Sequence, residues 1–560
     1  MAESGFELIM RNGVHPSRVI GKKVPPEPRF QEVRENGLHI QRNVVVQMRD
    51  GVSIFVDIYR PDGAPPDAKL PVLLGWSPYG KHNTNSQLAW PAADVAVGWM
   101  SQYTAFEAPD PLYWCRHGYA VCYPDPRGSW YSEGELRHGG PGEAEDEYDL
   151  IEWLGVQPWC NGKVGMSGVS YLTAAQWQVA PLRPPHLAAI NPWEGFSDWY
   201  REFAYHGGIP ETRFVVRGSG NLQWSTTRTE DTPSNARAHP LYDEYWASKE
   251  VNLEAADVPA YVVASWSDQG LHTRGSIEGF KRLGSRQKWL EVHGRKKWYY
   301  YYEPSNVEKQ RAFFDRFLKG ADAGRFDPPT VSIEVRERAN VGEFRGENEW
   351  PIARTQYRKL YLDPANAMLV DRPVATSGSV SYDTDALGGR AVFDYTFQDN
   401  TELSGHMSVR LWVEAQGADD MDLFVGLQKF DAQGDYVPFV FYAMMVNGPV
   451  ALGWLRASHR ELDPVRSRPE QPFHKHTREQ RLKAGERVPV DIEIWPSATS
   501  FKAGERLRLV VQGRDIEEHG LPNSPFAGHD DTRNRGTHVI HAGGSYDSHL
   551  LAAVIPPRSS

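Results

Sequence analysis

The sequence predicts an open α/β sheet in the first part of the chain and an all-β domain in the second. Up to about residue 325, short all-apolar runs alternate with segments whose apolar residues recur at helical spacing, which is typical of a parallel sheet covered by helices. Beyond it, short alternating runs separated by turn residues predominate, which favours a β-sandwich of the jelly-roll type. At 560 residues the chain is too long for one ordinary core, so two or three domains are expected.

The first part opens with a predicted hairpin and continues as alternating strands and helices. The segment NVVVQMRDGVSIFVDIYRP, from residue 43, indicates two strands joined at an Asp50-Gly51 turn. Apolar runs typical of strands buried on both faces follow it. These runs are residues 70–76, 118–125, 163–166, 187–192 and 258–265, and helices are predicted at EDEYDLIEWLG (145–155) and YLTAAQWQVAP (171–181).

One segment interrupts the strand and helix pattern. Residues 196–256 lose the buried strands and become aromatic and charged, as in DWYREFAYHGG, which is typical of a helical cap inserted over an α/β core. Pockets tend to form under such insertions. The predicted domains are therefore a core from 1–195 and 257–325, a cap from 196–256, and a C-terminal jelly roll from 326–560.

Composition and charge exclude several classes of protein. The 61 Lys and Arg against 72 Asp and Glu give a formal net charge of -11, which argues against a nucleic-acid or anionic-membrane surface. Three scattered cysteines predict neither a disulfide framework nor a zinc motif, and no basic leader or long apolar stretch is present. We expect a cytoplasmic protein without a metal or nucleic-acid partner, acting on a small molecule and possibly forming a homo-oligomer.

The stretch VGMSGVSYLTAAQW (164–177) contains two candidate nucleophiles, Ser167 and Ser170. The strand-to-helix elbow of an α/β hydrolase carries its serine on a tight turn, in the pattern G-x-S-x-G, which neither serine meets fully. Ser170 directly precedes the helical run, and the backbone N–H of Tyr171 then lies where an oxyanion donor is needed. We therefore choose Ser170, although a serine in this place could also serve only as a helix cap.

A serine nucleophile needs a base and an orienting carboxylate, which in this fold class follow in the chain, the acid first. Asp268 follows the buried strand 258–265 in the text SWSDQG. His293 lies where the next strand meets its loop, in LEVHGRKKW. The predicted triad is Ser170, Asp268 and His293, while the alternative is that Asp268 is a turn residue and His293 a loop histidine.

The motifs identify the chain as similar to the cocaine-esterase-like (CocE/NonD) serine hydrolases, relatives of X-Pro dipeptidyl-peptidases and α-amino-acid ester hydrolases. The resemblance rests on MRDGVSIFVDIYRP, SPYGK, DPRGSWYSEGE, IEWLGVQPWCNGKVGMSGVSY, ASWSDQGLHTRGS and GGSYDSHLLAAVIP. It implies an α/β-hydrolase core with a helical cap and a C-terminal jelly roll. By the same resemblance, Ser170, Asp268 and His293 form the triad, Tyr79 and Tyr171 form the oxyanion hole, and no cofactor is required.

Three alternatives stay open at this stage. The best-known members carry a GPWSH-like loop where this chain has VHGRKKW, so another alignment would place Lys296 or Lys297 at the base position. The substrate is expected to be a carboxylic ester, with an X-Pro peptide or amino-acyl substrate as the alternative, for which an acidic residue such as Glu194 or Asp198 would bind the ammonium group. Trp266 is a further candidate for substrate contact. An inactive hydrolase that only binds its ligand is the alternative outside enzymes.

Overall fold

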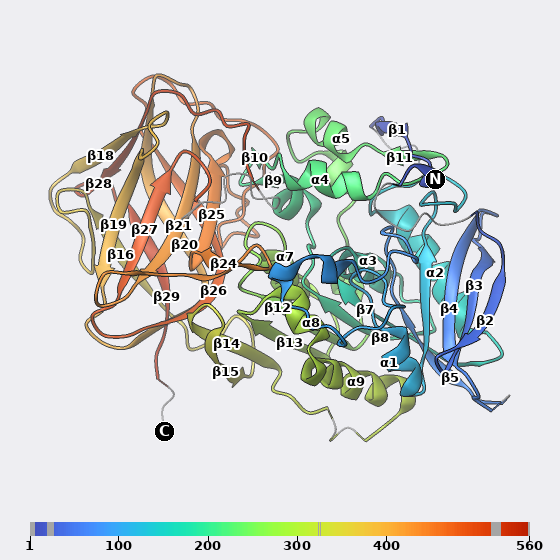
Figure 1. Cartoon of the computed structure of the whole chain (residues 1–560). Coiled ribbons are helices and arrows are strands. Elements are labelled where there is room, and N and C mark those ends of the chain that lie inside the picture. The colour runs from blue at the N-terminus through green and yellow to red at the C-terminus, as the bar shows by residue number, and fades with distance from the viewer. Residues whose placement is uncertain are drawn as a thin grey trace.

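The computed structural model describes residues 6–19, 27–65, 67–322, 324, 326–516 and 528–557. The α/β core and the C-terminal β domain lie side by side, with the core on the right and the β domain on the left in Figure 1. Both predicted parts, an α/β core and an all-β domain, are therefore present.

The core is a mixed sheet whose middle strands are parallel. Its outer strands are antiparallel, as the Asp50-Gly51 hairpin predicts. The parallel strands are largely buried, two of them along their whole length, because helices cover both faces of the sheet. In spatial order the strands are β2 (Gln31–Glu35), β3 (Leu38–Gln47), β4 (Ser53–Pro61), β6 (Ala120–Asp125), β5 (Leu70–Leu74), β7 (Cys160–Val169), β8 (Leu187–Trp193), β12 (Ala260–Ser265), β13 (Lys288–His293), β14 (Val331–Arg338) and β15 (Val341–Glu347).

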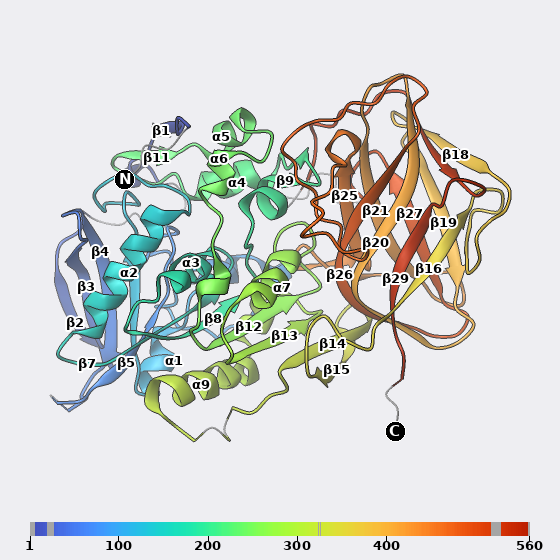
Figure 2. The same cartoon turned by 180° about the vertical axis from the view of Figure 1, so that it is seen from behind.

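Two apolar layers hold the helices against this sheet. One face carries α2 (Pro141–Gly155), α3 (Tyr171–Val179) and α7 (Thr273–Arg282), which bury side chains such as Leu150, Trp177 and Ile277. The other face carries α1 (Pro111–Arg116), α8 (Lys297–Tyr302) and α9 (Pro304–Lys319), with Trp114 and Phe313. Figure 2 shows α2, α3 and α7 from behind. The loops that follow the parallel strands all meet at one edge of the sheet, where ligands bind in such folds.

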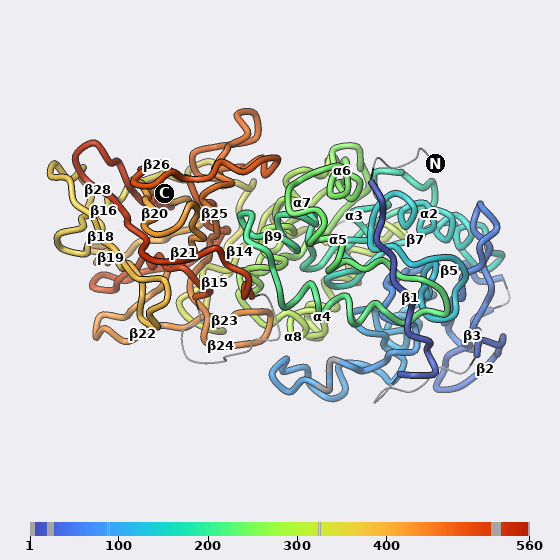
Figure 3. The backbone as a smooth tube through the Cα atoms, turned by 90° about the horizontal axis from the view of Figure 1, so that it is seen from above, coloured from blue at the N-terminus to red at the C-terminus, as the bar shows by residue number. Residues whose placement is uncertain are grey.

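Residues 196–256 leave the core between two strands that are neighbours in the sheet. β8 pairs directly with β12, at Ile190 with Ala260, so the intervening chain is an insertion. Its elements are the π-helix η5 (Trp199–Ala204), β9 (Tyr205–His206), β10 (Ile209–Pro210), α4 (Phe214–Asn221), β11 (Arg228–Glu230), α5 (Thr232–Ala238), α6 (Glu244–Ala247) and the short helix η6 (Leu253–Ala255). Figure 3 shows β1 (Met10–Asn12) running along this segment, where it pairs with β11.

The C-terminal strands close into a ring. The ring is completed by two single-residue pairings, Gly453 with Ile494 and Met368 with Asp394. The predicted all-β character is confirmed, but the ladders form a closed barrel, whereas a β-sandwich consists of two separate sheets. Its strands, in ring order, are β16 (Gln356–Asp363), β29 (His549–Ile555), β20 (Thr401–Gln416), β26 (Val488–Phe501), β25 (Ala451–Arg456), β21 (Asp422–Phe430), β27 (Arg506–Gln512), β19 (Arg390–Thr396) and β17 (Met368–Val370).

The two parts are joined through β14. This strand lies beyond the predicted boundary at residue 326, yet it pairs with β13 of the core sheet and meets β26 at Arg336 and Thr499. The Arg336 guanidinium is buried at this joint and donates to the Ser497 hydroxyl at 2.6 Å and to the Val450 carbonyl at 2.9 Å. In the described part of the chain, no helix is both long and apolar enough to cross a membrane.

Candidate active site

Ser170 lies on a strained elbow between β7 and α3. Its φ of 62° is left-handed, which is rare for a residue other than glycine and is a form of strain that occurs at functional sites. Gly168 precedes it with φ 144°, and a Cβ atom there would lie 2.2 Å from Leu172 Cδ2. Two carbonyls, of Trp193 and Glu194, accept the Ser170 N–H and fix the elbow. Backbone and small neighbours therefore present the Ser170 side chain beyond the end of the strand.

Ser167 has a structural environment instead. It is still within β7, and its Oγ lies 3.1 Å from Asn191 Oδ1 and 3.1 Å from the Tyr301 hydroxyl. Both partners lie in the core beneath the elbow, and no imidazole accompanies them. The choice of Ser170 over Ser167 agrees with this geometry.

His272 is the imidazole that contacts Ser170. Its Nε2 lies 3.1 Å from Ser170 Oγ, and its Nδ1 is hydrogen-bonded to Asp268 Oδ2. Asp268 and His272 are four residues apart in the loop that leads from β12 into α7, and the Asp268 carbonyl accepts the His272 N–H. Ser170, His272 and Asp268 thus form a buried chain of hydrogen bonds with the geometry of a catalytic triad.

Charges around this chain hold Asp268 ionised. Although burial opposes the charged carboxylate, Lys297 and His272 outweigh it and lower the pKa of Asp268. Burial lowers the pKa of His272, and Lys297 lowers it further, while Asp268 acts in the opposite direction. At neutral pH the imidazole is therefore uncharged, with one ring nitrogen able to accept a proton, as a general base must be before reaction.

His293, the base predicted from the sequence, is not brought to Ser170. It ends β13, and its Nδ1 accepts the Arg295 N–H at 3.1 Å while its Nε2 faces Glu194 Oε1 at 3.1 Å. Tyr300 stacks on the ring at a centroid distance of 3.8 Å. Both ring nitrogens are thus directed at groups other than the serine, and the base position belongs to His272 in this structure.

The predicted oxyanion donors both lie at Ser170. The Tyr79 side chain and Ser170 line the same cavity. Burial, with help from Glu107, raises the pKa of Tyr79 well above its usual value. The phenol therefore keeps its proton and can donate it. In α3 the Thr173 and Ala174 N–H groups bond to the Ser170 carbonyl, whereas the Tyr171 N–H belongs to the first turn, where the helix offers no acceptor.

A largely aromatic cavity of about 830 Å³, open mouth included, adjoins Ser170 and His272. Its walls come from the core and from the inserted segment. The residues Tyr79, Trp90, Phe106 and Trp298 form one side, and Phe196, Trp199, Phe203, Phe214 and Leu222, all within 196–256, form the other. This lining suits a partly apolar ligand.

Glu107 is a carboxyl group in the wall of this cavity that the sequence analysis did not single out. Its Oε1 accepts the Trp298 indole N–H at 2.9 Å, and its carbonyl accepts the Val169 N–H beside the elbow. Burial raises the pKa of Glu107 to about 8, against the opposing effect of Lys297. At neutral pH it is mainly uncharged.

The three predicted substrate contacts lie elsewhere. Glu194 is buried against Ser265, 2.5 Å away, and against His293. Asp198 caps η5 and pairs with Arg201 at 2.9 Å. Trp266 is buried in the core and donates to the Glu334 carbonyl. These side chains are occupied by structural roles and are absent from the described lining of the cavity.

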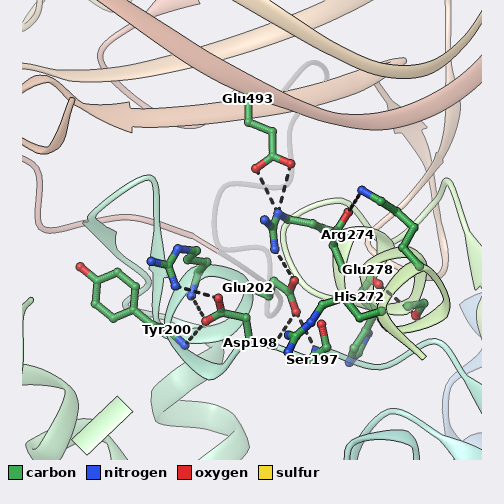
Figure 4. A network of polar contacts seen from close by, with 12 residues as sticks. Ser197, Asp198, Tyr200, Glu202, His272, Arg274, Glu278 and Glu493 are labelled. Atoms are coloured by element: carbon green, nitrogen blue, oxygen red, sulfur yellow. Dashed lines mark hydrogen bonds and ion pairs between the residues drawn. The ribbon is translucent and has the colours of Figure 1, made fainter. Parts of the chain in front are cut away.

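An ion-pair network fixes the helix that follows His272. Figure 4 shows Arg274, two residues after His272, between Glu202 and Glu493. Arg274 donates to Glu202 at 2.6 Å and to Glu493 at 3.0 Å, and Glu202 in turn accepts the Ser197 N–H. Because Glu493 belongs to β26, this network ties the His272 loop to the inserted segment and to the β domain together.

The β domain also contacts the two loops that carry Asp268 and Lys297. Ala443 donates its N–H to the Ser267 carbonyl at 3.2 Å and accepts the Lys297 N–H at 2.9 Å. Its φ of 66° is left-handed, so this contact holds a strained backbone. The Gln269 amide reaches the Pro496 carbonyl at 3.1 Å. Asp268 therefore lies between two residues that the β domain holds in place.

Two sequence signals could have found His272. It follows Asp268 by four residues, a spacing that places both side chains on one side of a helical turn, and it lies in the same strand-end loop. The rule that acid and base come from successive strand ends favoured His293 instead. From the sequence, Lys297 is a candidate only as an alternative base, and no pattern signals its contact with both Asp268 and His272.

Comparison with known proteins identifies related families for both parts of the chain. The model of X-Pro dipeptidyl-peptidase (S15 family) matches residues 50–238, and that of the X-Pro dipeptidyl-peptidase C-terminal non-catalytic domain matches residues 324–551. A curated relative, cocaine esterase from a Rhodococcus strain, is 27% identical and aligns with 92% of this chain and 98% of its own.

Solved structures extend the agreement to the whole chain. A CocE/NonD family hydrolase from Staphylococcus aureus is 39% identical, with a TM-score of 0.90 over 97% of this chain and 98% of that one. An α-amino acid ester hydrolase, 17% identical with a TM-score of 0.71 over 96% of this chain and 99% of that one, shares the fold. The resemblance inferred from the sequence motifs is confirmed: the chain belongs to the CocE/NonD family of serine hydrolases.

Proposed function

We propose that the protein hydrolyses carboxylic esters through an acyl-enzyme, with Ser170 as nucleophile, His272 as general base and Asp268 as the orienting acid. The observation that carries the proposal is the 3.1 Å contact between Ser170 Oγ and His272 Nε2, with the other ring nitrogen bonded to Asp268. A nucleophile, its base and the group that orients the base are then in one line.

The reaction would proceed in two steps. His272 takes the Ser170 proton as the oxygen attacks the ester carbonyl, and the Tyr79 hydroxyl and Tyr171 N–H donate to the oxyanion that develops. His272 then returns the proton to the leaving alcohol. Water, deprotonated by His272, attacks the acyl-enzyme and releases the acid, which restores Ser170. No step needs a metal or an organic cofactor.

The cavity supports an ester with an apolar acyl or alcohol group. The residues 196–256 would act as a cap over it, since they supply one of its aromatic walls. Amino-acyl and X-Pro substrates need a carboxylate for their ammonium group. Glu194 and Asp198 are engaged elsewhere, and Glu107 is mainly uncharged at neutral pH, so the ester proposal has the better support.

The test compares an aryl ester and an X-Pro anilide with wild-type protein, Ser170→Ala and the matched control Ser167→Ala. We expect ester turnover and labelling by a fluorophosphonate serine probe to vanish in Ser170→Ala and to persist in Ser167→Ala. Anilide cleavage that depends on Ser170 would instead place the protein among the peptidases. An unlabelled wild-type protein without turnover would favour a ligand-binding role.

A further inference from the structure

Lys297 contacts the two residues that would activate Ser170. Its Nζ lies 2.5 Å from Asp268 Oδ2 and 2.8 Å from His272 Nδ1, and its side chain is almost completely buried. The backbone N–H of Lys297 is held by the Ala443 carbonyl of the β domain. The neighbouring Lys296, by contrast, pairs with the half-exposed Asp94 away from the site. One of two adjacent lysines is thus built into the triad.

The groups that face Lys297 favour its charged form. Burial opposes the ammonium, but Asp268, Glu194 and Glu107 outweigh it and raise the pKa of Lys297 above its usual value. Two of these carboxyls face the base as well, since Asp268 and Glu194 both favour a protonated His272. The Lys297 ammonium, 2.8 Å from His272 Nδ1, opposes this effect of the two carboxylates on His272.

Hydrogen-bond geometry restricts what Lys297 can do. An ammonium has three donors and no acceptor. If His272 Nδ1 carries its proton and donates it to Asp268, Lys297 must also donate to Asp268 Oδ2, and Nε2 is left to accept the Ser170 proton. If Nδ1 instead accepts from Lys297, Nε2 carries the proton and cannot act as a base. An ionised Asp268 that accepts from both neighbours supports the productive form.

We infer that Lys297 is a positioning residue of this site: its ammonium holds the Asp268 carboxylate against His272 and disfavours the imidazolium, so that the base stays available below neutral pH. The inference rests on the proposed triad. A cation at 2.8 Å from the ring nitrogen repels an added proton. Removal of that charge should make His272 easier to protonate.

The test is the pH profile of kcat/KM on an aryl ester for wild type, Lys297→Met, Lys297→Arg and the matched control Lys296→Met. The acid limb reports the base of the free enzyme. We expect Lys297→Met to move this limb upward by about one pH unit, which means about tenfold less activity relative to the plateau at pH values below the limbs of both proteins. Lys297→Arg, which keeps the charge, and Lys296→Met should keep the wild-type limb.

A Lys297→Met limb that coincides with the wild-type limb would overturn the inference, whatever the height of its plateau. Ser170→Ala, assayed in parallel, separates the two levels of the argument, because turnover that survives in this variant removes the proposed function itself.

A measurement on the wild-type protein covers the case in which Lys297→Met does not fold. With ¹⁵N-labelled histidine, the His272 signal, assigned by its loss in His272→Gln, should show a protonated Nδ1 and an unprotonated Nε2 from pH 8 to below pH 6. A ring that carries its proton on Nε2, or that titrates at or above the usual histidine pKa of about 6.5, would overturn the inference.

Discussion

His272 and His293 are both buried next to a carboxylate, yet only one is positioned for catalysis. His293 is level with Ser265 in the ladder between β12 and β13, so it is still part of the sheet. His272 lies in the loop beyond the end of β12, where its ring reaches Ser170. Burial and an acidic partner are common to both, and the direction of the free ring nitrogen is what differs.

The difference shows why a histidine at a strand end is not sufficient evidence for a base. Residues inside the ladder have their side-chain direction set by the pleat, which alternates between the faces of the sheet. Residues in the following loop can turn toward the elbow. Asp268 and His272, both in the loop, converge on Ser170, whereas His293 packs under Tyr300.

The largest expected effect on activity comes from replacing His272, compared with replacing His293. His272→Ala should lower kcat/KM on an aryl ester by about 10⁴-fold, because the base that accepts the Ser170 proton is lost. His293→Asn, whose amide oxygen can still accept the Arg295 N–H, should retain activity within about tenfold. Steady-state kinetics, with thermal unfolding of each variant as a control for folding, check both values. The reverse order of effects would return the base to His293.

A second, smaller effect on kcat is expected when two tyrosines beside Ser170 are replaced and compared. Tyr79→Phe removes a hydroxyl from the cavity that Ser170 lines and should lower kcat by about 10²-fold, as the loss of one oxyanion donor does. Tyr171→Phe removes a hydroxyl that is turned away to Glu143 at 2.7 Å and leaves the backbone N–H in place. It should leave kcat within about threefold. Equal losses in both variants would contradict an oxyanion role for the Tyr79 side chain.

The sequence was sufficient for the features that depend on local pattern. The apolar runs predicted the parallel strands, and the turn before a helical run predicted the Ser170 elbow, because burial and backbone strain act on neighbouring residues. The change to short alternating runs predicted the all-β domain. Its closure into a ring did not follow, since single-residue pairings such as Gly453 with Ile494 leave no periodic signal.

The features that depend on distant residues could not be predicted in this way. Lys297 contacts Asp268 from another loop, and Ala443 of the β domain makes backbone hydrogen bonds to both loops. Glu194, predicted to bind a substrate ammonium group, is likewise engaged by Ser265, which is distant in the sequence, whereas Asp198 pairs with the nearby Arg201.

The smallest expected effect concerns histidines that are buried, like His293, and have no described contact with Ser170. Burial lowers the pKa of His206 and His474 to about 3 and that of His459 to about 4, each near the contact of the inserted segment with the β domain. The unfolded chain binds these protons from about pH 6.5 downward, whereas the folded chain does not. The contribution of these histidines to the free energy of unfolding is therefore fully present above about pH 6.5. It falls as the pH drops toward 4, by about 1.4 kcal/mol per pH unit for each histidine.

Urea unfolding between pH 7.5 and 5 measures this slope. His474→Gln should reduce this slope by the contribution of one histidine, about 1.4 kcal/mol per pH unit, and leave kcat/KM on an aryl ester unchanged, because the His474 ring lies beside His476 and is absent from the described lining of the cavity at Ser170. An unchanged slope would mean that His474 is protonated in the folded protein, and a loss of turnover would couple the domain contact to Ser170. A histidine that affects acid stability alone, set beside His272, which should affect turnover, would show that burial by itself does not make a ring catalytic.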